Sequence, residues 1–168
     1  MLKFILPTEQ NEIEVLSFYG EIENNGGECI GIANYKNYDL WLKNMQNRHT
    51  GEDLPEGYVR ENFYLCYEKD RLIGVFSLKF ELTKFLLDYG GHIGYAVRPS
   101  QRNRGLATQM LKQGLELAKE FGFDRVLCIC DDDNRASEKV ILKNCGVFED
   151  RRYFSDENVF VKRFWINL

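Results

Sequence analysis

The chain has 168 residues, a formal net charge of −4 and an aromatic content of 14%. The acidic balance argues against a general nucleic-acid or membrane-surface binder, and no apolar run has the length of a signal peptide core or of a membrane span of roughly 18 residues. The five cysteines include no CxxC pair and the two histidines are isolated, which favours a reduced, cytoplasmic protein without a metal site.

The hydrophobic pattern predicts strands and helices that alternate along the chain. In chain order, the predicted elements are a strand at 2–7, helices at 9–24 and 38–48, strands at 58–68, 71–82 and 90–97, a helix at 103–121, a strand at 124–130, a helix at 134–144, and two strands within 146–168. No linker or internal repeat interrupts this order. We therefore expect residues 1–168 to form a single α/β domain with a mixed sheet.

The stretch "YAVRPSQRNRGLATQML", residues 95–111, places basic residues where a predicted strand passes into a predicted helix. The first N–H groups of a helix have no intrahelical partner and the helix dipole favours anions, so such a turn can bind a phosphate or diphosphate. Gly105 would let the backbone approach the anion closely. An ordinary turn with solvated arginines is the alternative. The absence of a P-loop lysine and of GxGxxG argues against kinases and dehydrogenases.

Arg102-x-x-Gly105-x-Ala107 resembles the (Gln/Arg)-x-x-Gly-x-(Gly/Ala) motif of the GNAT N-acetyltransferase superfamily. Asn134-x-x-Ser137 opens the next helix as in that superfamily, and the order of elements agrees. The stretch 85–99 is similar to a branch of predicted acetyltransferases without a settled substrate. The resemblance implies a mixed, mostly antiparallel sheet that is splayed between the fourth and fifth strands and flanked by helices.

The resemblance also implies acetyl-CoA as co-substrate, with its diphosphate at the start of the helix after the fourth strand. The preceding strand would offer backbone groups to the pantetheine and to the acetyl carbonyl. Asn134 would contact the pantetheine, although a plain helix N-cap is the alternative. The residues expected to bind the cofactor are Tyr95, Ala96, Val97, Arg102, Asn103, Arg104, Gly105, Leu106, Ala107, Thr108, Asn134 and Ser137.

The implied reaction is direct transfer of the acetyl group from acetyl-CoA to a primary amine. The chain departs from the usual pattern at Ile141, where many members carry an acidic tyrosine, and at Ile129, where some carry a glutamate. His92 is the remaining candidate base, because its ordinary pKa near 6.5 suits proton transfer, and Ser137 is a second candidate catalytic residue. For His92 and Ser137, a purely structural role is the alternative. Tyr95 could serve as an acid or as part of the core.

The acceptor is expected to be an amine-bearing small molecule or a peptide N-terminus, and the superfamily often forms homodimers. Nucleic acid, membrane and metal are not expected as partners. Several acidic and aromatic residues could line the acceptor site: Glu81, Asp88, residues 131–133, Tyr19, Trp41 and Phe85. The main alternative is a catalytically silent acetyl-CoA-binding sensor or interaction domain. A regulatory nucleotide-binding domain is a further alternative.

Overall fold

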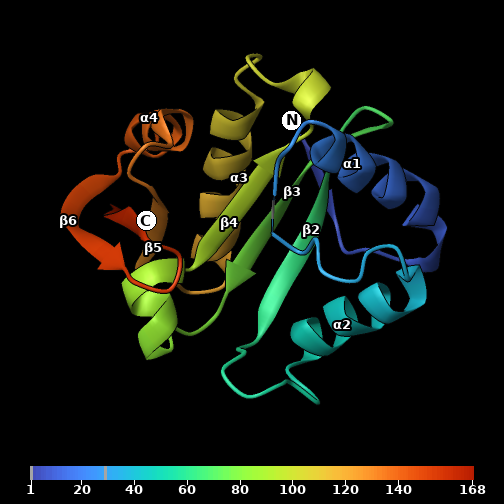
Figure 1. Ribbon diagram of the computed structural model, residues 1–168, viewed down its shortest axis with the longest axis horizontal. Coiled ribbons are helices and arrows are strands. Elements are labelled where there is room, and N and C mark those ends of the chain that lie inside the picture. The colour runs from blue at the N-terminus through green and yellow to red at the C-terminus, as the bar shows by residue number, and fades with distance from the viewer. Residues whose placement is uncertain (1, 29) are drawn as a thin grey trace.

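One seven-stranded sheet runs through the molecule in the order β1-β2-β3-β4-β5-β7-β6 (Figure 1). The computed structural model describes residues 2–28 and 30–168. The strands are β1 Lys3–Ile5, β2 Glu61–Glu68, β3 Arg71–Lys79, β4 Ile93–Val97, β5 Arg125–Asp131, β6 Val147–Phe154 and β7 Val159–Asn167. All neighbouring strands pair antiparallel except β4 and β5, which are parallel.

Helices cover both faces of the sheet. Figure 1 shows α1 and α2 on one side of the central strands and α3 and α4 on the other. The α-helices are α1 Glu12–Asn24, α2 Tyr38–Thr50, α3 Leu106–Glu120 and α4 Arg135–Lys143. Shorter turns of helix are the 3-10 segments Glu9–Asn11 and Pro99–Gln101, called η1 and η3, and the π-helix Leu86–Gly90, called η2. This arrangement is a mixed α/β fold, as predicted.

Two hydrophobic cores follow from the alternation of side chains along the strands. Phe63 and Leu65 of β2 pack toward α1 and α2, while Tyr64 and Cys66 pack toward α3. Strands β2 and β3 are therefore buried on both faces, which explains why their sequences are apolar without a polar side. The central strands thus lie between two helical layers.

Around the fourth strand, two boundaries differ from the predicted ones and one short helix was not predicted. Helix α3 begins at Leu106 and not at 103, because Asn103 and Gly105 have left-handed backbones with φ of +63° and +75°. Strand β4 begins at Ile93 and not at 90. The residues before it form the unpredicted π-helix Leu86–Gly90, whose five residues are too few to give a helical pattern in the sequence.

The cysteines in the described part of the chain are free thiols. Cys66, Cys128 and Cys130 are buried and Cys145 is exposed, whereas Cys29 lies outside the described residues. Within residues 2–28 and 30–168, no group of three or more His, Cys, Asp or Glu side chains is placed to hold a metal ion. None of the described helices has both the length and the apolar character needed to cross a bilayer.

Candidate functional site

Strands β4 and β5 are paired only at the start of β4 and diverge after it. β4 is in register with β3 over five residue pairs and β5 with β7 over seven, whereas β4 and β5 share one pair, Ile93 with Cys128. Just before it, the His92 N–H donates to the Leu127 carbonyl at 2.8 Å. No pair joins residues 94–97 to β5 in the described chain. The sheet is therefore splayed between its fourth and fifth strands, as predicted.

Helix α3 begins beside this splay with backbone N–H groups that no side chain caps. Its N-cap residue is Gly105, and the first intrahelical hydrogen bond runs from the Gln109 N–H to the Gly105 carbonyl at 3.2 Å. The N–H groups of residues 106–108 have no hydrogen-bond partner among the described residues. In α2 and α4, by contrast, the side chains of Asn37 and Asn134 cap the first turn. The start of α3 is therefore suited to bind an anion.

The three arginines before α3 make different contacts. Arg98 is buried and pairs with Glu21 of α1 at 2.9 Å. Arg104 pairs with Glu68 at the end of β2, at 2.8 Å. Arg102 donates from Nε to the last carbonyl of β4 at 3.2 Å and, within the described chain, makes no ion pair. Arg102 is therefore the arginine with a guanidinium group available to a ligand, whereas Arg98 holds the segment in place.

Glu21 is a residue of this site that the sequence analysis missed. Its carboxylate accepts the Ser100 N–H at 2.6 Å and the Arg98 guanidinium at 2.9 Å, and so anchors the segment between β4 and α3. Burial acts to raise the pKa of Glu21, but the hydrogen bonds from Ser100 and Arg98 outweigh it and hold the pKa below its usual value. Nothing in the sequence near Glu21 signals this contact, because its partners are 77 and 79 residues away.

The hydroxyl of Tyr95 connects β4 to the first turn of α4. It lies 2.9 Å from Ser137 Oγ, and the Ser137 N–H donates to the Asn134 side chain at 3.0 Å. Burial raises the pKa of Tyr95, so the phenol is protonated at neutral pH. One turn further along α4, Ile141 is fully buried in the core. Two hydroxyl groups thus meet between the cofactor strand predicted above and α4.

His92 is tied to β5 by its ring as well as by its backbone. The Leu127 N–H donates to His92 Nδ1 at 2.8 Å, and the ring packs edge-on against Phe123 and Trp165 at 5.5 and 6.1 Å between centroids. Burial, with a smaller contribution from the charge of Lys79, lowers the pKa of His92 to about 4. These contacts favour a structural role where β4 meets β5, and a role as the base remains a prediction.

The amino-acid sequence from residue 34 to residue 147 matches the acetyltransferase (GNAT) family. The chain belongs to the GNAT acetyltransferase family. The predictions of an acyl-CoA-dependent N-acetyltransferase and of acetyl-CoA as co-substrate are thereby confirmed at the level of the family. Among curated proteins, no sequence matches this GNAT chain.

Solved structures of GNAT acetyltransferases share the fold. An acetyltransferase from Salmonella typhimurium that modifies the N-terminal serine of ribosomal protein L7/L12 is 16% identical, with a TM-score of 0.76 over 99% of this chain and 95% of its own. The microcin C7 self-immunity acetyltransferase, solved with acetyl-CoA and AMP, is 13% identical, with a TM-score of 0.76 over 99% and 92%. A ribosomal-protein-S5-alanine acetyltransferase from Vibrio fischeri is 13% identical, with a TM-score of 0.74 over 99% and 92%.

The residues considered above for the acceptor site of this GNAT domain do not all lie on its surface. Tyr19 and Trp41 are fully buried in the core under α1 and α2, so they support the fold and do not line a pocket. Phe85 is exposed at the π-helix. Asp88 is ion-paired with Lys84 and Arg152. Its charge is therefore already balanced on that side of the domain.

Proposed function

We propose that this chain binds acetyl-CoA with the diphosphate at the start of α3, and that it transfers the acetyl group directly to a primary amine. The observation that carries the proposal is the uncapped first turn of α3 beside the splay. The space in front of the turn is open, because a Cβ built at Gly105 would meet no atom within 4 Å. The available guanidinium group of Arg102 adds positive charge at the same place.

The proposed binding residues fall into three groups along the path of the cofactor. Backbone groups of residues 102–108 would hold the diphosphate, with Arg102 adding a charged contact. The backbone of residues 95–97, which lie on β4 beside the splay, would align the pantetheine and the acetyl carbonyl. Asn134 uses its side-chain oxygen to cap α4, which leaves its amide N–H groups for the pantetheine.

Acetyl-CoA supplies an activated thioester, and the chain has to orient it and move protons. A backbone N–H of β4 aimed at the carbonyl oxygen would stabilise the negative charge that develops there. The acceptor amine must lose a proton before it attacks, because an alkylammonium has a pKa of about 10.4. We assign the leaving sulfur to the neighbourhood of the Tyr95 and Ser137 hydroxyls, which can donate hydrogen bonds to it. A base at His92 or a chain of water molecules would take the proton of the amine.

A catalytically silent acetyl-CoA-binding domain is the second candidate, and specific contacts favour it. Ile141 places an apolar side chain where many relatives carry an acid, and His92 Nδ1 is already occupied by Leu127. Release of free thiol from acetyl-CoA with a panel of primary amines separates the two functions. Amine-dependent thiol release establishes the transferase. Calorimetric binding of acetyl-CoA without thiol release across the panel establishes the silent domain.

We also infer that residues 1–168 act as one domain, since the single sheet extends from β1 near the N-terminus to β7 near the C-terminus. Cytoplasmic location and a homodimer remain proposals. Sedimentation of the purified chain with and without coenzyme A tests the oligomeric state.

Replacing Arg102 by alanine is expected to weaken coenzyme A binding by about tenfold, the usual loss for one charge-assisted hydrogen bond. Arg104→Ala is the matched comparison, and we expect a smaller loss because Arg104 already pairs with Glu68 and Gln101. Calorimetry at two salt concentrations measures both variants, and the effect of Arg102→Ala should shrink at high salt. Equal losses for the two variants would remove the distinction between the arginines.

A further inference from the structure

A pocket of about 390 Å³ lies between the α1–α2 loop, helix α2 and the loop that leads from α2 to β2. Its lining includes three asparagine side chains, Asn34 from the first loop and Asn44 and Asn47 from α2. The site described above does not use this pocket. Its position and its chemistry together indicate what it binds.

The pocket lies at the same level of the sheet as the start of β4. Arg48, on the pocket wall, pairs with Glu61 at 2.9 Å, and Glu61 stands opposite Lys79 in the β2–β3 register. The Lys79 N–H then donates to the His92 carbonyl at 2.8 Å, directly before β4. The pocket therefore lies on the α2 side of the sheet, at the end where β4 begins.

The α1–α2 loop joins the pocket to the cofactor strand. Ile30 packs directly on β4, since a Cβ at Gly94 would lie 2.9 Å from its side chain. The next residue, Gly31, lines the pocket, and its carbonyl accepts from Trp41 Nε1 at 2.7 Å. Gly31 has φ of +72°, and a Cβ there would lie 2.7 Å from the Phe63 ring. The loop is thus pressed against the core, with β4 on one side and the pocket on the other.

The polar groups of the pocket suit a peptide backbone. Each of the amides of Asn34, Asn44 and Asn47 offers both donors and an acceptor, which match peptide C=O and N–H groups. Glu61 pairs with both Arg48 and Lys79, so the positive charge of Arg48 is only partly balanced. Asp53 is the only carboxylate among the described lining residues. A polyamine chain would need more carboxylates than this pocket provides.

We propose that the pocket binds the main chain of a peptide acceptor a few residues after its N-terminal amine. The proposal rests on the proposed function, because it takes the reacting amine to lie at the splay beside Gly94. The α1–α2 loop lies between β4 and the pocket, and an extended chain advances by at most about 3.5 Å per residue, so several residues are needed to pass from the reacting amine over this loop. The acceptor is therefore the N-terminus of a peptide or protein, and an isolated amino acid is too short to reach both places.

Peptide length tests the proposal. A hexapeptide with a free N-terminus should be acetylated with a kcat/KM at least tenfold above that of the amide of its first residue alone. Asn44→Leu and Asn47→Leu should each lower kcat/KM for the hexapeptide by about fivefold, the usual effect of one hydrogen bond. Neither variant should change kcat/KM for the single-residue amide, which does not reach the pocket.

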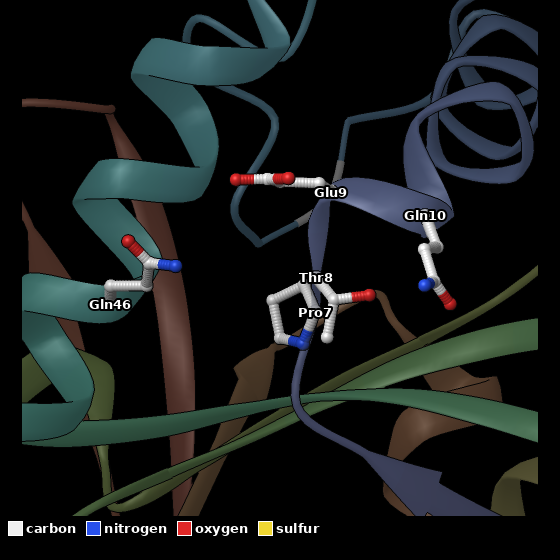
Figure 2. A pocket seen from close by; sticks show the side chains of 5 residues that line it. All are labelled: Pro7, Thr8, Glu9, Gln10 and Gln46. Atoms are coloured by element: carbon white, nitrogen blue, oxygen red, sulfur yellow. The ribbon is translucent and has the colours of Figure 1, made fainter.

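Gln46→Leu is the matched control on the same helix. Figure 2 shows Gln46 of α2 facing a separate hollow of about 300 Å³, beside Glu9 and the chain after β1. Gln46 is exposed, whereas Asn44 and Asn47 are half-buried. The control variant should acetylate both acceptors as the unmodified chain does. A rate that is independent of peptide length, or equal losses for Gln46→Leu and the asparagine variants, would overturn the proposal while leaving the transferase function intact.

Peptide binding provides a readout that needs no turnover. In the presence of coenzyme A, the N-acetylated hexapeptide should shift the side-chain amide NMR signals of Asn44 and Asn47 and leave that of Gln46 in place. Absence of these shifts would reject the pocket even if small amines are acetylated. Shifts without any amine-dependent thiol release would instead retain the pocket as a peptide site and reject the transferase.

Discussion

Gly105→Glu is expected to abolish binding of coenzyme A while the domain stays folded. A glutamate at this position brings a negative charge to the turn where the N–H groups of residues 106–108 have no other partner. It also places a side chain in the open space that the anion would occupy. The repulsion and the lost contacts together should reduce the affinity by more than about 100-fold, since charge-assisted hydrogen bonds contribute about 1.5–3 kcal/mol each. Titration calorimetry measures the affinity.

Gly122→Glu is the matched control at the other end of α3. Gly122 also has a left-handed backbone, with φ of +85°, and a Cβ there would meet no atom within 4 Å. Both variants therefore carry a similar strain of about 1–2 kcal/mol from the left-handed conformation, but only one of them lies at the candidate anion site. We expect Gly122→Glu to bind coenzyme A with unchanged affinity. Gly105→Ala introduces the backbone strain without the negative charge, so its affinity separates the two effects. Equal affinities for the two glutamate variants would remove the start of α3 from the cofactor site.

The fold was predictable from the sequence where packing imposes a regular pattern. The apolar spacing of Leu106, Met110 and Leu111 places one face of α3 on the sheet, and these residues are buried as that spacing requires. The short apolar run 124–130 became β5, which lies between two neighbouring strands. Hydrophobic spacing carries no information on backbone handedness, so it could not place the start of α3 after Asn103 and Gly105.

The parts of the site that a local motif encodes were predictable, and those that depend on distant contacts were not. Gly105 and the turn around it follow from a few neighbouring residues. The direction of Arg98 depends on Glu21, which comes from α1 and is far away in the sequence. The contact between Tyr95 and Ser137 likewise joins residues 42 positions apart. A single sequence does not report such pairs, since each partner alone is an ordinary surface or core residue.

In the His92→Asn variant, the free energy of unfolding is expected to fall less than in the unmodified chain as the pH drops from 6.5 to 4. Burial, and to a lesser extent the charge of Lys79, lowers the pKa of His92 to about 4 in the folded chain, whereas an unfolded histidine titrates near 6.5. Between these pH values the unfolded chain binds more protons than the folded one, so the free energy of unfolding falls as the pH drops from 6.5 to 4. The contribution of one such histidine over this range is about 3 kcal/mol.

Asparagine is the suitable replacement because its side-chain oxygen can accept the Leu127 N–H in place of Nδ1 and does not titrate. Urea unfolding at several pH values gives the free energy of unfolding for both chains. The two curves should converge as the pH falls, because only the unmodified chain loses the contribution of His92. Parallel curves across this range would show that His92 does not have the lowered pKa that its burial implies.

The same variant decides whether His92 is the catalytic base. Nδ1 accepts a hydrogen bond from a backbone N–H, so the neutral ring carries its proton on Nε2 and has no nitrogen free to take a second proton. If the ring only joins β4 to β5, His92→Asn should keep kcat within about threefold and retain the acidic limb of its pH profile. General base catalysis contributes about 10²–10⁴-fold, so a fall of kcat in that range, with loss of the acidic limb, would instead assign the base to His92 and require its ring to leave Leu127 during turnover.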